Sequence, residues 1–482
     1  MWLVVNYCGK FPSHQLFGMV RFSKQADEIR ILTANAMLGY GYKSDHFCFG
    51  IHEYRPDAIV IDSGSTDGGP FKLGMGRKTV ADESYIRDLT PYITACAHYG
   101  MKLLISSAGG DGSDKHVAEI LAIVDKIIED NGFKFKVATI GAAVPKGLIR
   151  QKLKDGKISP CGPVPPLTPE DIDSAVDIVA QMGPEPFIKA LEEEKPDIIV
   201  AGRAYDPSPF AAFCMNLGVE RAPAFHLGKI LECGGQCAVP KGRSMIATIR
   251  KDSFDLTPLN PIERCTPLSL DDFLENRVRN YTRGLFPELD KSDDCRLIFH
   301  VYGRNAIMGP LEPNSEPAHE VGVLGEVVAP TAAKAMAICN SARVSCLHLY
   351  YPGILATTGN FASPLSPHEQ DAGAVFKFSL YHLMEIDDPT DPTIFPIKSS
   401  TAGAGTFVKD KNFGKQFFNL DNFLNISPEE IKTKSVPTGP ATMRDVASVV
   451  RSKNSGPFEL SFDIMFNDGK ALSACQEGQC SH

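Results

Sequence analysis

Carboxylates follow several apolar runs that are typical of buried β-strands, and these are the residues most suited to chemistry. They are Asp62 and Asp67 after the run at 58–61, Asp111 after 102–106 and Asp206 after 197–201. Because the carboxyl ends of parallel strands meet at one edge of a sheet, we expect these side chains to share a crevice. There they could act in general acid–base catalysis or bind Mg²⁺. Each aspartate alone is more often a turn or helix-capping residue.

The same loops carry small residues and one arginine that could hold an anion. Ser65 and Thr66 lie in the first loop, and Gly109 and Gly110 in the second. Backbone N–H groups in such loops can bind a carboxylate or a phosphate, although the glycines could also only make tight turns. Arg203 is predicted to clamp a substrate carboxylate, and the alternative is a structural ion pair with a nearby aspartate.

A segment near residue 230 places four reactive side chains at close to helical spacing: His226, Lys229, Glu232 and Cys233. We predict His226 as a proton-transfer residue and the other three as substrate contacts. Cys233 could instead be a nucleophile activated by His226, or a buried packing residue. The sequence leaves these alternatives open.

Cofactor motifs are missing from the strand-end loops. None has the Gly-x-Gly-x-x-Gly form or the Gly-x-x-x-x-Gly-Lys-Ser/Thr form, so we predict neither a nicotinamide dinucleotide nor a nucleotide cofactor. Cys233 with Cys237 and Cys475 with Cys480 are the short-spaced pairs, and a structural zinc site is not expected from them. Mg²⁺ is the metal that the carboxylates would favour, but no ligand is assigned to it.

The alternation of apolar runs, loops and amphipathic stretches predicts an α/β fold with a mostly parallel, Rossmann-like sheet and helices on both faces. Helical periodicity covers 82–99 and 117–128, and a further strand is expected at 135–140. Thr168, followed by a proline and two acidic residues, predicts a helix start.

The chain is long enough for several units. We predict an N-terminal extension (1–28), a parallel α/β domain (29–244), a mixed α+β domain (245–408), a linker (409–436), and a partial small C-terminal domain with a tail (437–482). In the second domain, strands are expected at 245–249, 296–302 and 344–350. In the last segment, a helix is expected at 442–447 and a strand at 459–466.

The composition disfavours several partners. The net charge of -9 does not suit nucleic acid or an anionic lipid surface, and no apolar stretch approaches the length needed to span a bilayer. The 13 cysteines form no disulfide framework, so reduced thiols in the cytoplasm are expected.

Four loops, taken together, are similar to the loops of a known family: 62–70, 107–112, 201–207 and 225–235. They resemble the acyclic terpene utilisation (AtuA-like) family over roughly 29–408. Residues 437–468 resemble the start of a small domain that is often fused after it. Residues 1–28 have no counterpart in that pattern, and the small domain is expected to be cut short after Asp468. The resemblance implies catabolism or modification of branched terpene-like molecules that carry a carboxylate or CoA.

Together, the loops and the resemblance predict a lyase, hydratase or isomerase that acts by proton transfer on a branched carboxylate or CoA thioester. A hydrolase using Cys233 or an activated water is an alternative. A non-catalytic binding or assembly subunit for a pathway enzyme is another, and a homo-oligomer is compatible with each of these hypotheses.

Overall fold

The computed structural model describes residues 28–64, 70–238, 241–259, 270, 273–291, 295–304, 306–307, 309–311, 318–351, 368–369, 378, 380–410, 412–420, 441–442, 447–454, 460–466 and 480–481. From residue 421 onward it describes the backbone of strands.

An 8-stranded sheet organises the first half of the chain. Its strands, in spatial order, are β12 (Ile397–Ala402), β4 (Phe135–Ile140), β6 (Ile198–Ala201), β3 (Lys102–Ser106), β2 (Ala58–Asp62), β1 (Ile29–Thr33), β7 (Met245–Ile249) and β8 (Phe254–Pro258). The strands from β4 to β1 are parallel, whereas β12, β7 and β8 run antiparallel to their neighbours. The predicted mostly parallel α/β sheet is therefore confirmed.

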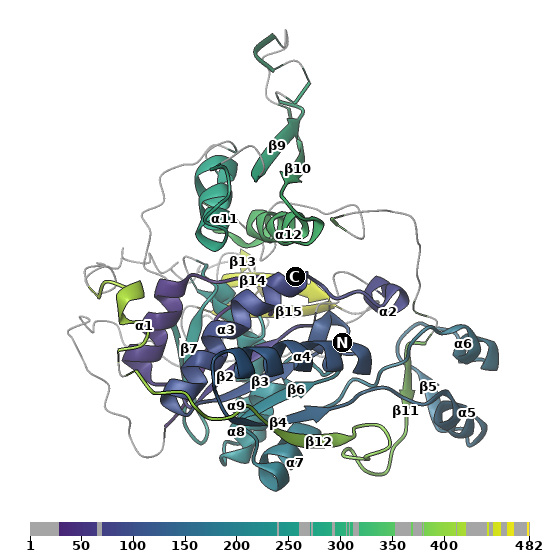
Figure 1. The fold of residues 1–482 in the computed structure, drawn as a ribbon. Coiled ribbons are helices and arrows are strands. Elements are labelled where there is room, and N and C mark those ends of the chain that lie inside the picture. Colours follow the sequence, from purple (N-terminus) through teal and green to yellow (C-terminus); the bar gives the residue numbers. More distant parts are fainter. Residues whose placement is uncertain are drawn as a thin grey trace.

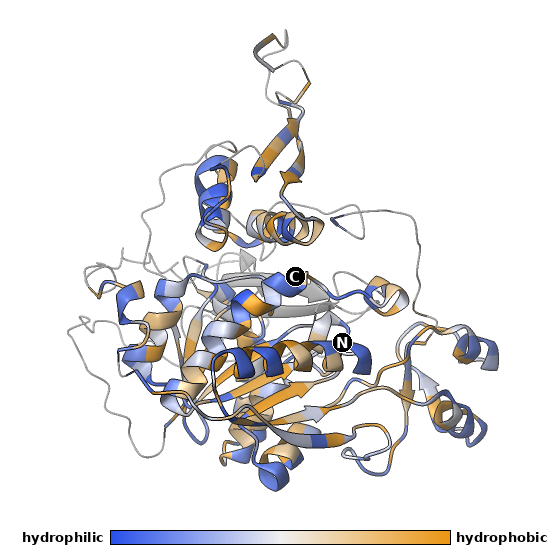
Figure 2. Ribbon diagram, in the orientation of Figure 1, coloured by the Kyte–Doolittle hydropathy of each residue, from blue (hydrophilic) through white to orange (hydrophobic). Residues whose placement is uncertain are grey.

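Helices cover both faces of this sheet (Figure 1). One face is covered by α1 (Ser44–Tyr54), α3 (Asp82–Tyr99) and α4 (Asp114–Asp130), and the other by α7 (Glu185–Lys189), α8 (Ser208–Asn216) and α9 (Arg221–Leu231). Residues of each central strand point alternately into the two apolar cores, as Leu32 and Ile31 of β1 do. Figure 2 shows the apolar strands between helices with polar outer surfaces.

The connections change face between β3 and β6, which are neighbours in the sheet. The chain leaves β3 through α4 on the first face, and leaves β6 through α8 on the second face. Loops that diverge in this way from adjacent parallel strands leave a crevice at the carboxyl ends of the strands, where α/β proteins bind ligands. The topology therefore places the candidate site at this edge of the sheet.

Smaller elements surround the sheet. They are α2 (Phe71–Met75), α5 (Lys146–Lys154), α6 (Pro169–Ser174) and the pair β5 (Ile158–Pro160) with β11 (His382–Met384). The predicted cap at Thr168 is confirmed, because its hydroxyl accepts from the N–H of Asp171 and the Asp171 carboxylate accepts from the N–H of Thr168. In the described part of the chain, no helix has the length and apolar character needed to cross a membrane.

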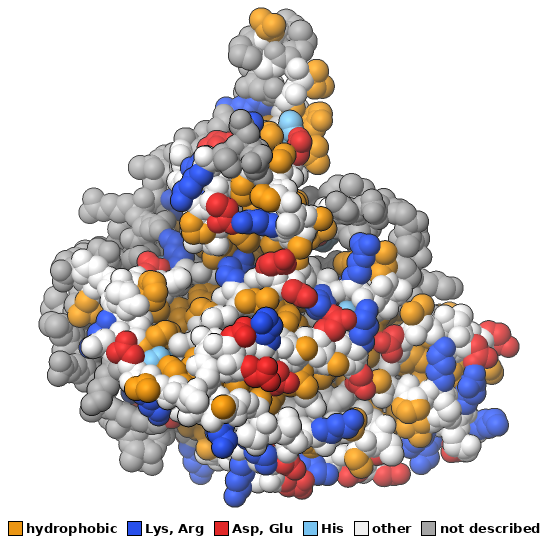
Figure 3. Space-filling view, viewed as in Figure 1, with side chains coloured by type: hydrophobic (Ala, Val, Ile, Leu, Met, Phe, Trp, Pro, Cys, Tyr) orange, Lys and Arg blue, Asp and Glu red, His pale blue; other side chains and the backbone are white. Residues whose placement is uncertain are grey.

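A second cluster of elements stands above the sheet in Figure 1. It contains α11 (Arg279–Leu285), α12 (Ala332–His348) and the antiparallel hairpin of β9 (Arg296–Tyr302) with β10 (Gly322–Val328). The strand predicted at 296–302 is confirmed. On the face seen in Figure 3, acidic and basic side chains are intermixed.

The strand predicted at 344–350 is wrong, because α12 continues to His348. The helix begins where the Thr331 hydroxyl accepts from the N–H of Lys334. Its buried residues Ile338, Ala342 and Cys346 recur at helical spacing. A short apolar run fits a strand or a buried helix equally well, and only the distant cap decides between them.

The strands at the boundary between the two predicted domains belong to the first sheet. β7 pairs with β1, and β8 pairs with β7, although the sequence pattern assigned 245–249 to the second domain.

In the C-terminal segment, β13 (Ala441–Thr442) pairs with β16 (Cys480–Ser481), and β14 (Ala447–Asn454) pairs with β15 (Leu460–Phe466). The strand predicted at 459–466 is thus confirmed. The interior of the helix predicted at 442–447 lies outside the described residues, and its two end residues belong to strands.

Candidate active site at the carboxyl ends of β2, β3 and β6

Asp62, the last residue of β2, lies at the centre of the candidate site. Its side chain is buried, with 2% of the residue exposed. The Ser106 hydroxyl donates to Oδ1 at 2.6 Å, and the N–H of Gly64 donates to Oδ2 at 2.9 Å. These two bonds hold the carboxyl group in one orientation at the crevice edge of the sheet.

The surroundings of Asp62 favour its protonated form. Burial raises the pKa of Asp62 to about 7, and the neighbouring carboxylates of Asp206 and Glu232 push it in the same direction. The Arg203 guanidinium and the hydrogen bond from Ser106 oppose this rise. A carboxyl group with a pKa near neutrality can both take up and release a proton at physiological pH, as a general base or acid must.

Arg203 lies close to the Asp62 loop. A Cβ at Gly64 would lie 2.5 Å from Arg203 Nη1, so a larger residue there would push the guanidinium aside. Arg203 Nη2 lies 3.5 Å from Asp206 Oδ1, and both side chains are mostly buried. The two alternatives for Arg203 are therefore not exclusive, because a guanidinium has five N–H donors and can bind an aspartate and a ligand carboxylate together.

Asp111 belongs to a separate cluster on the side of α4. Its Oδ1 accepts from the N–H of Ser113 at 2.9 Å and from His116 Nδ1–H at 2.7 Å. His116 is fully buried, and its Nε2 faces the carbonyl of Gly76 at 3.3 Å. The strand-end aspartates thus form two groups, with Asp62 and Asp206 in one and Asp111 in the other.

The predicted glycines Gly109 and Gly110 pack tightly in the same loop. A Cβ at Gly109 would lie 2.5 Å from His116 Cβ, and one at Gly110 would overlap the Thr79 hydroxyl. This packing accounts for glycine at both positions, and their role in ligand binding stays a prediction.

The residues near position 230 divide between two environments. Lys229 Nζ lies 3.0 Å from Glu232 Oε1, and Glu232 is buried close enough to Asp62 to raise its pKa. Cys233 follows α9 and is also buried. His226 lies elsewhere, where its ring packs edge-on against Phe254 at 5.2 Å between centroids. The structure therefore brings Lys229 and Glu232 to the site, and proton transfer by His226 stays a prediction.

Ser65, Thr66 and Asp67, which were predicted from the first loop, lie outside the described residues. Within the described part of the chain, His, Cys, Asp and Glu side chains form no group of three or more that could hold a metal ion. The possible Mg²⁺ site stays a prediction, since Asp67, one of the strand-end carboxylates, lies outside the described residues.

Sequence reasoning missed Ser106 and His116. Ser106 ends β3 opposite Asp62 in the parallel pairing, and this register was not available from the sequence. His116 had a detectable signal, because Ser113 caps α4 and the third residue after a cap faces back toward the preceding loop. An aspartate in that loop is then a natural partner.

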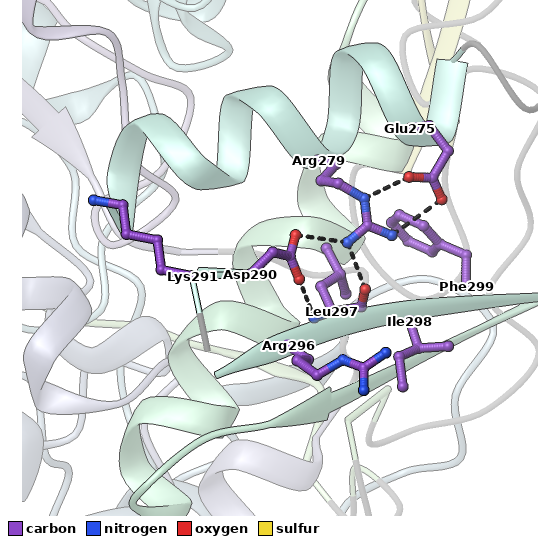
Figure 4. Close-up of a pocket in the computed structure, with 8 residues that line it drawn as sticks. All are labelled: Glu275, Arg279, Asp290, Lys291, Arg296, Leu297, Ile298 and Phe299. Carbon is purple, nitrogen blue, oxygen red and sulfur yellow. Dashed lines mark hydrogen bonds and ion pairs between the residues drawn. The ribbon is translucent and has the colours of Figure 1, made fainter. Parts of the chain in front are cut away.

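A pocket in the second cluster of elements is shown in Figure 4. Its central cation is Arg279, whose guanidinium binds Glu275, the Asp290 carboxylate at 2.8 Å and the carbonyl of Leu297. Because these acceptors already engage Arg279, the pocket is an internal ion network that ties α11 to β9. The strand-end crevice remains the better candidate site.

Comparison with known families supports the resemblance. The family model described as "Acyclic terpene utilisation family protein AtuA" matches residues 72–245, which contain the Asp111 and Arg203 loops. A domain of unknown function, DUF4387, matches residues 443–480, past Asp468, where the sequence pattern placed the end of the small domain. Searches of curated proteins and of solved structures gave no match. The two family matches are consistent with an AtuA-like protein that carries a small C-terminal domain.

Proposed function

We propose that this protein is an enzyme that uses Asp62 to remove a proton from, or return it to, carbon in a branched carboxylic acid or its CoA thioester. The observation that carries this proposal is the geometry at the end of β2. There, a buried carboxyl group is held by Ser106 and Gly64 beside the Arg203 guanidinium. A base of this kind and an anion-binding group are the two requirements of enolate chemistry.

The electrostatic balance of the site supports a role for Asp62 as a base. Burial and two nearby carboxylates raise its pKa to about 7, so a substantial fraction is ionised at neutral pH. In the ionised form it is a stronger base than an exposed aspartate, because its conjugate acid holds the proton more tightly. Lyases, hydratases and isomerases that act next to a carbonyl share this step.

Arg203 supports a carboxylated or thioester substrate. Its guanidinium lies close to Gly64, and its Nη2 lies 3.5 Å from Asp206 Oδ1. A substrate carboxylate or the oxygen of an enolate could pair with the remaining N–H groups. The family match associates the chain with acyclic terpene utilisation, and this supports a branched carbon skeleton.

The experiment is exchange of a substrate proton in deuterated water. The purified protein is incubated with a panel of branched carboxylates and CoA thioesters, and deuterium at the carbon next to the carbonyl is measured by mass spectrometry. Loss of a general base typically costs about 100-fold to 10,000-fold, so Asp62→Asn should lose exchange by that factor. Asp130→Asn is the control, because Asp130 is an exposed residue at the far end of α4.

Two outcomes would contradict the proposal. One is wild-type protein that exchanges no member of the panel, and the other is exchange that survives in Asp62→Asn. Inactivation by iodoacetamide together with hydrolysis of a thioester would favour the alternative hydrolase, although the burial of Cys233 limits the access of the reagent.

A further inference from the structure

Asp111 has a buried carboxylate oxygen that no described residue satisfies. The residue is 6% exposed, and Oδ2 has no hydrogen-bond partner in the part of the chain that the structure describes. Buried polar atoms are nearly always paired, because an unpaired oxygen loses its hydration without compensation. An oxygen left in this state can accept a hydrogen bond from a ligand or from water.

The other oxygen of Asp111 is fixed by two donors. Ser113 N–H and His116 Nδ1–H both donate to Oδ1, and both lie at the start of α4. His116 is itself held, since its Nε2 faces the carbonyl of Gly76 and its side chain is fully buried. If Asp111 only helped to begin α4, Oδ1 alone would be sufficient. Such a role does not account for Oδ2.

The Asp111 loop is joined to the Asp62 site through the backbone. Gly112 packs directly against the backbone of Arg203, where a Cβ would overlap it, and the N–H of Arg203 donates to Gly112 O at 3.0 Å. Asp62 and Ser106 are paired at the ends of adjacent strands, and Asp111 follows Ser106 by one short turn. The two carboxyl groups are therefore carried by neighbouring loops at the same edge of the sheet.

We propose that Asp111 is the second proton-transfer group of this site, with His116 as the residue that positions it, and that the substrate is a branched 3-hydroxyacyl thioester or the matching unsaturated thioester. This inference rests on the proposed function of Asp62. It names a reaction class, the reversible loss of water.

The chemistry balances with two carboxyl groups and no added reagent. The Asp62 carboxylate takes the proton from the carbon next to the carbonyl, and the electron pair of that C–H bond forms the new C=C bond. The C–O bond at the next carbon breaks, and the leaving oxygen takes the proton from protonated Asp111 at Oδ2, which releases water. In the reverse direction, Asp111 removes a proton from water and Asp62 protonates the carbon.

Two titratable groups lie close to Asp111. Asp177 is close enough to feel the charge of Asp111, and its pKa is raised by burial and then by Asp111 and Asp114, against a hydrogen bond from Ile178 N–H. Tyr85, on α3, is a further titratable neighbour.

The test separates the two proton transfers. Exchange of the carbon-bound proton needs only the base, whereas elimination of water needs both groups. With a branched 3-hydroxyacyl-CoA in deuterated water, Asp111→Asn should lower elimination by about 100-fold or more, while exchange falls far less. Asp62→Asn should lower both rates together. Asp130→Asn serves as the exposed control.

His116 is tested with two variants. Asn can place an amide N–H where His116 Nδ1–H lies, so His116→Asn should keep elimination within about 10-fold of the wild type, whereas His116→Leu should lose it like Asp111→Asn. Circular dichroism and melting temperature check that each variant folds. If His116→Leu does not fold, the contrast between Asp111→Asn and His116→Asn carries the test.

The results that would contradict the proposals for Asp62 and for Asp111 are different. If the wild type exchanges no substrate proton, the proposed function of Asp62 fails, and the role of Asp111 fails with it. If exchange depends on Asp62 but elimination is unchanged in Asp111→Asn, or falls equally with exchange, only the inference about Asp111 is overturned.

Discussion

Replacing Asp62 with asparagine should make the protein more stable at neutral pH while abolishing its activity. The amide can keep the local hydrogen bonds, since its oxygen can accept from the N–H of Gly64 and its NH₂ group can donate to the Ser106 hydroxyl. The substitution removes only the charge. It therefore relieves the cost of an ionised carboxyl group among other carboxylates in a buried site.

The magnitude follows from the raised pKa of Asp62. In the unfolded chain Asp62 ionises near pH 3.8, whereas in the folded protein it keeps its proton up to about pH 7. Between these values the folded state binds more protons than the unfolded state, so wild-type stability falls as pH rises, by about 1.4 kcal/mol per pH unit. Over the whole window the loss is about 4 kcal/mol, and the asparagine variant does not share it.

The assay is thermal unfolding of the wild type, Asp62→Asn and Asp130→Asn from pH 5 to pH 8. The stability advantage of Asp62→Asn over the wild type should increase steadily up to about pH 7 and then become constant, with a melting temperature about 4 °C above that of the wild type. Asp130 is exposed and paired with Lys126, so its variant should differ from the wild type by less than about 0.5 kcal/mol at every pH.

A constant difference between Asp62→Asn and the wild type across this range would refute the reasoning. It would mean that Asp62 titrates alike in the folded and unfolded states, so that burial and neighbouring carboxylates do not shift its pKa. The proposed base would then lose its electrostatic support, whatever its position.

Three further changes test other parts of the structure. Gly112→Ala should destabilise the protein by about 2 kcal/mol or more in thermal unfolding, because its φ of +69° is strained for alanine and its Cβ would overlap the backbone of Arg203. His98 accepts a hydrogen bond from the N–H of Asp410, and burial lowers its pKa. Since the folded state then favours the neutral ring, stability is lost as pH falls below 6.5. The protection of backbone amides at 403–410, measured relative to the intrinsic exchange rate at each pH, should therefore be lower at pH 5 than at pH 7.5. Arg279→Ala leaves Glu275 without this partner, whereas Asp290 keeps Arg283, so stability should fall by about 1 to 3 kcal/mol, with proton exchange at the Asp62 site unchanged.

Much of the first domain could be predicted because its strands carry a strong local signal. The runs that became β2, β3 and β6 are apolar on both faces, as expected for parallel strands covered on both sides, and each ends at a small or polar residue. The second cluster of elements was harder to predict. There, α12 contains a short apolar run that fits the period of a strand as well as that of a helix. The helix is determined by its cap at Thr331 and by packing against α11.

The candidate site shows the same division between local signal and tertiary placement. The strand-end rule correctly expected several carboxylates at one edge of the sheet, but it could not say which of them face each other. Ser107 has a left-handed backbone, with φ of 50°, and the chain after it turns so that Asp111 meets His116 on α4. Asp62 instead ends its strand without such a turn and remains beside Arg203. Conformations of this kind are imposed by tertiary packing, which is why residue types alone could not separate the two groups.

That separation also bears on mechanism. If all the strand-end carboxylates lay in one cluster, mutual repulsion would raise their pKa values together, and the site would offer several similar acids. With Asp111 held by a histidine and Asp62 facing carboxylates and an arginine, the two groups have different partners and can differ in their affinity for a proton. Different environments for two carboxyl groups allow one to act as the acid while the other acts as the base. The turn after β3 is therefore the structural feature on which a two-group mechanism would depend.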